Sequence, residues 1–112
     1  MDITNDPAST PAQRIEALRG GVADEHFPSW VPESNNHIHT CFSFSPYTPT
    51  HAALLARRNG LRVVGSVDHD SIGAAAEMSE ATRILGMGSV TGFEIRARFG
   101  EGTPLAQRKL NN

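Results

Sequence analysis

Two histidines that are one residue apart, His37 and His39, are the first residues of this sequence whose types and spacing could do chemistry. Residues i and i+2 of a strand point to the same face and lie about 7 Å apart, since the rise is about 3.3 Å per residue. Two imidazoles placed in this way can converge on one metal ion. They can also be two polar residues at the end of a strand, so the pair needs partners before it indicates a site.

Such partners occur just after one later apolar segment and within another. Asp68 and His69 come directly after "LRVVGSV", and Glu94 lies within "SVTGFEIRARF". In α/β folds ligands bind beyond the carboxyl ends of the strands, and neighbouring parallel strands lie about 4.8 Å apart. We therefore expect these side chains to meet the histidine pair. Imidazole and carboxylate ligands together suit Zn, Mn or Fe, and a carboxylate such as Glu94 can bridge two ions.

The segments that carry these residues alternate between strand and helix patterns. Strands are expected at 35–40, 61–67 and 89–99, and helices at 48–60 and 72–86. The first of these helices has Thr48 as N-cap, Pro49 at its first position and an apolar stripe made by Ala52, Leu55 and Ala56. The order predicts parallel strands joined by right-handed crossovers, and therefore an α/β fold.

The first 33 residues have a different character. "TPAQRIEALRGG" predicts a short helix with Thr10 as N-cap and Gly20 as its end, and the two prolines of "EHFPSWVPES" indicate a connector. We therefore divide the chain into an N-terminal extension (1–33) and part of an α/β domain (34–112). Three strands and two helices leave both edges of the sheet open and provide little core, so we expect the chain to be the beginning of a larger domain.

Composition excludes several classes of protein. The net charge of −2 argues against electrostatic binding of nucleic acid or membrane. No apolar run approaches the roughly 20 residues of a membrane span, and the polar, acidic first residues do not resemble a secretory signal. A single cysteine, Cys41, rules out an internal disulfide framework. We read it as a packing residue, and we expect a cytoplasmic location.

The motifs in this order resemble one family. "HIHT", a helix ending in "ARRNGL", then "VVGSVDHDS" and "TGFEI" are similar to the first motifs of the polymerase and histidinol phosphatase (PHP) family of metal-dependent phosphoesterases, H-x-H-T, T-D-H-D and G-x-E. The similarity extends from Asn35 to Ile95. It implies the first three βα units of a distorted (β/α)7 barrel of the PHP type, with two or three divalent ions at the C-terminal face of its strands.

The resemblance also implies roles for individual residues. His37 and His39 would ligate one metal, Glu94 would bridge it to a second, and His69 would ligate a further one. Asp68 would orient the neighbouring site, by hydrogen bond or by direct ligation. The family's loop after H-x-H-T continues x-x-S-D-G with an aspartate ligand, but here Phe44 stands in that place. A third metal site is therefore expected to be lost or rebuilt from other groups.

Other readings of the same residues remain open. Arg96 and Arg98 lie on the same face of the expected strand as Glu94 and could reach a substrate phosphate, which makes Arg96 a catalytic candidate beside Asp68. Arg96 could instead pair with Glu94. Asp68 could be only the cap of the helix at 72–86, a role for which Ser71 competes.

The remaining polar residues near the motifs carry weaker signals. Asp70 is expected to cap a helix or support the site rather than bind metal. His69 could be a hydrogen-bonded loop residue. His51 is expected at the surface of its helix, in the first turn.

The sequence therefore predicts a metal-dependent phosphoesterase that hydrolyses a phosphomonoester or small nucleotide through a metal-activated water. Its partners would be a small phosphorylated substrate and the remainder of the barrel, in the same or another chain. One alternative is an amidohydrolase-type metal hydrolase, which also opens with H-x-H but uses a lysine on a middle strand, whereas the only lysine here is Lys109. The other is a truncated, non-catalytic fragment that binds metal weakly or pairs with another chain.

Overall fold

The computed structural model describes residues 2–43, 45–98 and 109–111, and it describes side chains only as far as residue 95. Phe44, which stands at the expected ligand position, lies outside the described residues. The side chains of Arg96 and Arg98 lie outside them as well.

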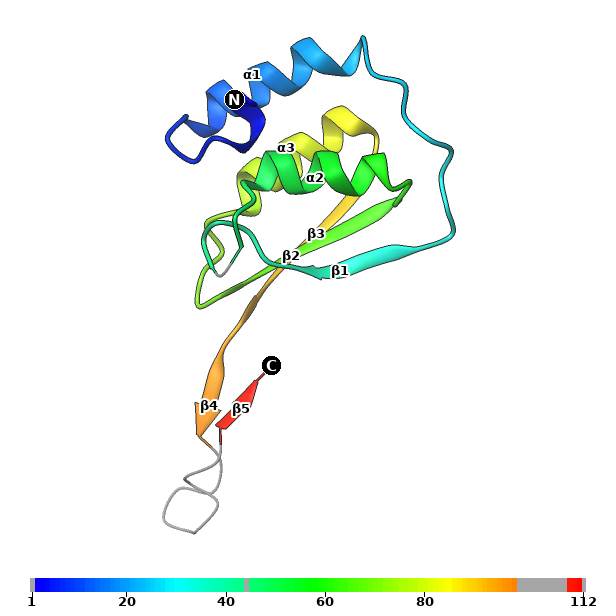
Figure 1. The fold of residues 1–112 in the computed structure, drawn as a ribbon. Helices are drawn as coiled ribbons and strands as arrows, with labels where there is room; N and C mark the ends of the chain where they lie inside the picture. Colours follow the sequence, from blue (N-terminus) through cyan, green and yellow to red (C-terminus); the bar gives the residue numbers. More distant parts are fainter. Residues whose placement is uncertain (1, 44, 99–108, 112) are drawn as a thin grey trace.

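The centre of the fold is a parallel sheet of three strands in the order β1-β2-β3 (Figure 1). The strands are β1 (Ser34–Ile38), β2 (Val63–His69) and β3 (Gly88–Glu94). β2 and β3 pair in continuous register, ending at His69 opposite Glu94, whereas the register of β1 with β2 shifts between Asn35 and Ile38. The expected α/β arrangement with parallel strands is confirmed.

Two helices, α2 (Pro49–Arg58) and α3 (Ala75–Leu85), cover one face of this sheet (Figure 1). α2 begins as predicted, because the Thr48 side chain accepts a hydrogen bond from the backbone N–H of His51. α3 ends at Gly86, which adopts the left-handed conformation with φ 74°. Between sheet and helices lies a core of small and medium side chains: Leu18, Ala52, Ala53, Leu54, Ala56, Val64, Met78, Ala81, Leu85 and Met87. Leu55 of the expected stripe is only partly buried, and Ala53 and Leu54 are buried in its place.

No described helix or strand covers the opposite face of the sheet (Figure 1). Val90 on this face is 51% exposed. Gly65 lies opposite Val90, and a Cβ there would come within 2.8 Å of the Asn36 carbonyl oxygen and 2.7 Å of the Val90 side chain. A side chain at position 65 would therefore collide with β1 at Asn36, the residue just before His37, so glycine is required there.

The N-terminal segment packs against the two helices. It contains a 3-10 turn, η1 (Ile3–Asn5), and α1 (Pro11–Val22), whose Thr10 and Gln13 form a reciprocal capping box. The prediction that Gly20 ends this helix is wrong, because α1 continues to Val22. Gly20 does not take the positive φ that a left-handed helix end requires.

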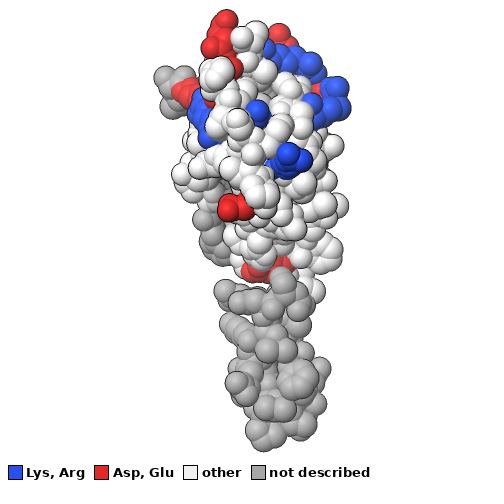
Figure 2. Space-filling model, turned by 90° about the vertical axis from the view of Figure 1, so that its right-hand side faces the viewer, with Lys and Arg blue, Asp and Glu red and all other residues white. Residues whose placement is uncertain are grey.

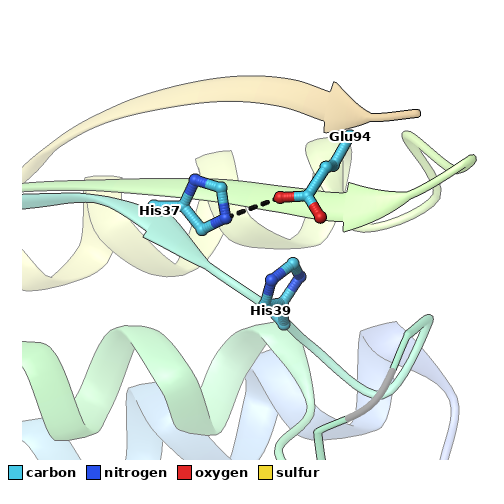
Figure 3. A group of neighbouring side chains, drawn as sticks. All are labelled: His37, His39 and Glu94. Carbon is cyan, nitrogen blue, oxygen red and sulfur yellow. Dashed lines mark ion pairs between the residues drawn. The ribbon is translucent and has the colours of Figure 1, made fainter. Parts of the chain in front are cut away.

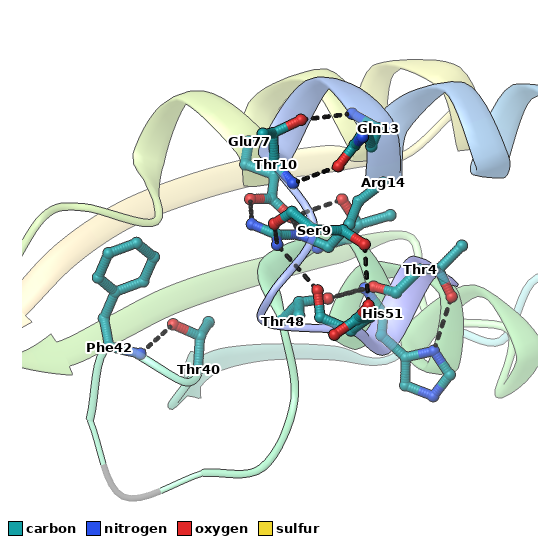
Figure 4. A network of polar contacts seen from close by, with 12 residues as sticks. Thr4, Ser9, Thr10, Gln13, Arg14, Thr40, Phe42, Thr48, His51 and Glu77 are labelled. Atoms are coloured by element: carbon teal, nitrogen blue, oxygen red, sulfur yellow. Dashed lines mark hydrogen bonds and ion pairs between the residues drawn. The ribbon is translucent and has the colours of Figure 1, made fainter. Parts of the chain in front are cut away.

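A buried ion pair fastens α1 to α3. Arg14 donates two hydrogen bonds to Glu77, at 2.8 Å from Nε and 2.6 Å from Nη2 (Figure 4). Glu77 also accepts from the backbone N–H and the hydroxyl of Thr50 on α2. One carboxylate therefore joins all three helices.

The third expected strand is shorter than predicted. β3 ends at Glu94, and residues beyond it form β4 (Arg96–Arg98), which pairs antiparallel with β5 (Lys109–Asn111) in a separate sheet. The expectation that Arg96 and Arg98 continue the strand of Glu94 is wrong. The physical reason is that β2, the partner of β3, has already ended at His69.

The surface carries charges of both signs. On the face seen in Figure 2, basic and acidic side chains lie near one another toward the helical end of the molecule. Within the described residues, no helix is both long enough and apolar enough to cross a membrane.

Candidate metal centre

The carboxyl ends of the strands bring three potential ligands together on the uncovered face of the sheet. His37 and His39 come from the end of β1, and Glu94 is the last residue of β3 (Figure 3). Their ligand atoms, one from each residue, all lie within 4.8 Å of one another. The convergence expected of the H-x-H pair and the early glutamate is therefore present in the fold.

Glu94 lies at the middle of this group. Its Oε1 is 2.9 Å from Nε2 of His37, and its Oε2 is 2.9 Å from Nε2 of His69. The residue is only 8% exposed, whereas the His37 side chain is open to solvent. The carboxylate thus holds a histidine from β1 with one oxygen and a histidine from β2 with the other.

The three imidazoles pack against one another. The rings of His39 and His69 are stacked, with centroids 4.9 Å apart and an interplanar angle of 11°. The ring of His37 meets that of His39 edge-on, at 5.1 Å and 84°. All four residues that the sequence suggested as metal ligands therefore belong to one cluster.

The donor set fits a divalent ion. Ligands held tetrahedrally at about 2.1 Å from a zinc ion are about 3.4 Å from one another. The observed spread of up to 4.8 Å therefore requires the side chains to close in slightly around an ion. Two imidazoles and one carboxylate suit Zn, Mn or Fe, and the set leaves ligand positions open for water or substrate.

Asp68 supports the cluster from the other side of the sheet. It is 1% exposed and accepts hydrogen bonds from the loop after β1: at 2.6 Å from the Thr40 N–H, at 2.8 Å from the Thr40 hydroxyl and at 2.8 Å from the Ser43 hydroxyl. The interpretation that Asp68 or Ser71 caps the following helix is wrong. α3 starts after Ala74 with no side-chain cap, and Ser71 accepts from Gly73 instead.

Sequence reasoning missed the parts played by Thr40 and Ser43. Thr40 is fully buried, and Ser43 Oγ lies 3.3 Å from Nδ1 of His39. The only signal in the sequence was that both residues carry hydroxyl groups and follow the H-x-H pair closely. Their partner, Asp68, is far away in the sequence, so only the strand pairing brings them together.

Other candidate residues have different surroundings from those expected. His51 is partly buried rather than openly exposed: its Nδ1 lies 3.1 Å from the Thr4 hydroxyl, and burial lowers its pKa below the usual value (Figure 4). Cys41 is exposed rather than packed. Asp70 is exposed, adopts φ 55°, and donates its N–H to the Glu94 carbonyl at 2.9 Å, so it ends β2 and holds the end of β3.

Comparison with known proteins gives one informative match. No protein-family model matches the chain, and no curated protein matches it in sequence. The fold is similar to the crystal structure of a protein from Bifidobacterium adolescentis, provisionally described as a metal-dependent phosphoesterase, with a TM-score of 0.61 and 28% sequence identity. The match covers 77% of this chain and 27% of that one, so the chain spans about a quarter of that protein's length.

Proposed function

We propose that this chain provides the first metal-binding strand ends of a metal-dependent phosphoesterase of the PHP type. The observation that carries the proposal is the convergence of His37, His39 and Glu94 at the ends of neighbouring parallel strands. The similarity to a protein provisionally described as a metal-dependent phosphoesterase supports the class of reaction. The order of the sequence motifs supports the family.

In this proposal His37 and His39 would hold one divalent ion, His69 would contribute to the site of a second, and Glu94 would serve both. The contacts of Glu94 support this division, because one of its oxygens faces His37 and the other faces His69. The metals would be Zn, Mn or Fe, which accept such mixed ligands. Asp68 would act on the site through the loop it holds, and Arg96 remains the candidate for contact with a substrate phosphate.

The proposed substrate is a phosphomonoester or a small nucleotide, hydrolysed in the cytoplasm. When bound, the ions would supply Lewis-acid chemistry, lowering the pKa of a water and neutralising charge on the phosphoryl oxygens. The exposed edge of His37 lets solvent and substrate approach the cluster, while burial of Glu94 keeps its carboxylate in place. Further βα units of the barrel, in the same or another chain, would contribute the later ligands and cover the open face of the sheet.

Two measurements on the purified protein test the proposal: metal content by mass spectrometry after dialysis against Mn²⁺ or Zn²⁺, and turnover of an aryl phosphate. We expect this chain to bind metal, and we expect metal-dependent turnover once the further βα units of the barrel are present; both are abolished by His37→Ala and by Glu94→Ala. The matched controls are His26→Ala and Glu16→Ala, because both residues are exposed and lie away from the cluster. Retained turnover in the cluster variants would overturn the assignment, and metal binding without turnover even in the presence of those further units would identify a non-catalytic metal-binding chain.

A further inference from the structure

The hydroxyl of Ser43 stands between a carboxylate and an imidazole. Its Oγ is 2.8 Å from Oδ1 of Asp68 and 3.3 Å from Nδ1 of His39. A serine hydroxyl has a single proton to donate and two lone pairs with which to accept. It can therefore act as donor toward only one of these two neighbours.

Asp68 decides which neighbour receives that proton. A carboxylate accepts hydrogen bonds and donates none. Its other two partners, the N–H and the hydroxyl of Thr40, also donate to it. The Ser43 proton therefore points to Asp68, and toward His39 the Ser43 oxygen has only the role of acceptor.

We propose that Ser43 is a positioning residue that sets the tautomer of His39, with the proton on Nδ1 and the lone pair of Nε2 left for a metal ion. The ring nitrogen that carries a proton is determined by the hydrogen bond that nitrogen makes. Stacking on His69, with the rings 11° from parallel, holds the imidazole plane while Ser43 fixes which edge faces the loop. Asp68 thus acts on His39 through Ser43.

The use of this tautomer for metal binding rests on the proposed function, but the tautomer itself is a property of the metal-free chain. A neutral imidazole without an acceptor at Nδ1 prefers the Nε2–H form in water, which has no lone pair at Nε2. Loss of the Ser43 hydroxyl would therefore oppose metal binding even where the fold is unchanged. Partners that orient a ligating histidine in this way typically change metal affinity by about 10- to 100-fold.

The direct test is ¹⁵N NMR of the histidine rings in the metal-free chain at about pH 8, above the ordinary histidine pKa of about 6.5. The His39 signals are identified by their loss in His39→Gln. We expect the Nδ1–H tautomer in the unaltered protein and a shift toward Nε2–H in Ser43→Ala. An Nε2–H tautomer in the unaltered protein would overturn the inference, and that measurement does not depend on any serine variant folding.

An internal reference exists in the same spectra. His51 Nδ1 faces the Thr4 hydroxyl at 3.1 Å, and that hydroxyl also lies 2.7 Å from an oxygen of Asp2, which is the same arrangement. We expect Nδ1–H at His51 in both the unaltered protein and Ser43→Ala. If the tautomer changes at His39 but not at His51, the change results from loss of the Ser43 hydroxyl and not from a general loss of structure.

Metal affinity provides the second readout. Titration with Co²⁺ is expected to give about 10-fold weaker binding or worse for Ser43→Ala, and near-normal binding for Ser43→Thr, which keeps a hydroxyl. Ser45→Ala is the matched control, because Ser45 lies in the same loop and its hydroxyl accepts from the Tyr47 N–H. An unchanged His39 tautomer in Ser43→Ala would overturn the inference. If the tautomer shifts as expected but no form of the protein hydrolyses a phosphoester, the positioning role stands and the proposed function fails.

Discussion

Nε2 of His37 and Oε1 of Glu94 lie 2.9 Å apart although their strands are not neighbours. β1 and β3 flank β2, so the two side chains reach toward each other over the central strand, a span of about 9.6 Å between strand axes. His69 at the end of β2 lies against the other oxygen of the same carboxylate. The contact is diagonal: Ile38 at the end of β1 pairs with Ser66, whereas His69 and Glu94 pair at the ends of β2 and β3, so the His37 and Glu94 side chains meet across different levels of the sheet.

Glu94→Gln should weaken metal binding by at least about 100-fold, because it removes the negative charge at the centre of the cluster while keeping the shape of the side chain. Isothermal titration with Zn²⁺ measures the effect. Glu16→Gln, at an exposed position of α1, should bind as the unaltered protein does. Equal Zn²⁺ affinities for Glu94→Gln and Glu16→Gln would show that Glu94 does not bind the metal.

Asp68→Asn should lower the free energy of unfolding by about 1–3 kcal/mol. The amide nitrogen cannot accept, so at least one of the three loop donors from Thr40 and Ser43 loses its partner in a buried position. Urea unfolding followed by circular dichroism measures the change. Asp70→Asn is the adjacent control: it is exposed, and asparagine tolerates its positive φ, so we expect a change within about 0.5 kcal/mol. A similar small effect at both positions would mean that the loop bonds contribute little.

Glu77→Gln should destabilise the fold by about 3 kcal/mol or more, because it leaves the Arg14 guanidinium buried without a counter-charge. Burial opposes ionisation of Glu77, but hydrogen bonds from Arg14 and Thr50 outweigh it and hold the pKa of Glu77 below its usual value. Thermal unfolding of the variant tests this. The control is Glu80→Gln on the same helix, whose partners Arg19 and Arg83 are exposed. We expect little change there, and comparable losses in both variants would contradict the buried role.

Stability should fall as the pH drops below about 6.5 because of His51. Burial lowers the pKa of this histidine; Asp2 partly offsets the effect and Arg58 adds to it. Between the lowered folded pKa and the ordinary value of 6.5, the unfolded chain binds more protons than the folded one, so the free energy of unfolding decreases as the pH falls through that window. Urea titrations at a series of pH values should reveal this slope, and His51→Asn should flatten it. If the free energy of unfolding of His51→Asn depends on pH as steeply as that of the unaltered protein, groups other than His51 cause the dependence.

The sequence was sufficient for features that depend on near neighbours. Thr48 followed by Pro49 begins α2, and Gly86 ends α3, because capping bonds and left-handed turns involve residues a few positions apart. The same local logic failed at Gly20, where nothing in the backbone requires a left-handed residue and the helix continues. It failed again after Glu94, because the end of a strand depends on where its partner ends.

What the sequence by itself determined was the set of residues available to the site: His37, His39, His69 and Glu94, each within or just after a segment with strand character. The tertiary structure decided which of them touch, with Glu94 placed between His37 and His69 and with Asp68 turned away to hold Thr40 and Ser43. The physical reason is that strand order and register set the contacts between residues distant along the chain. Alternation along a strand predicts the face of a side chain but not the partner that meets it.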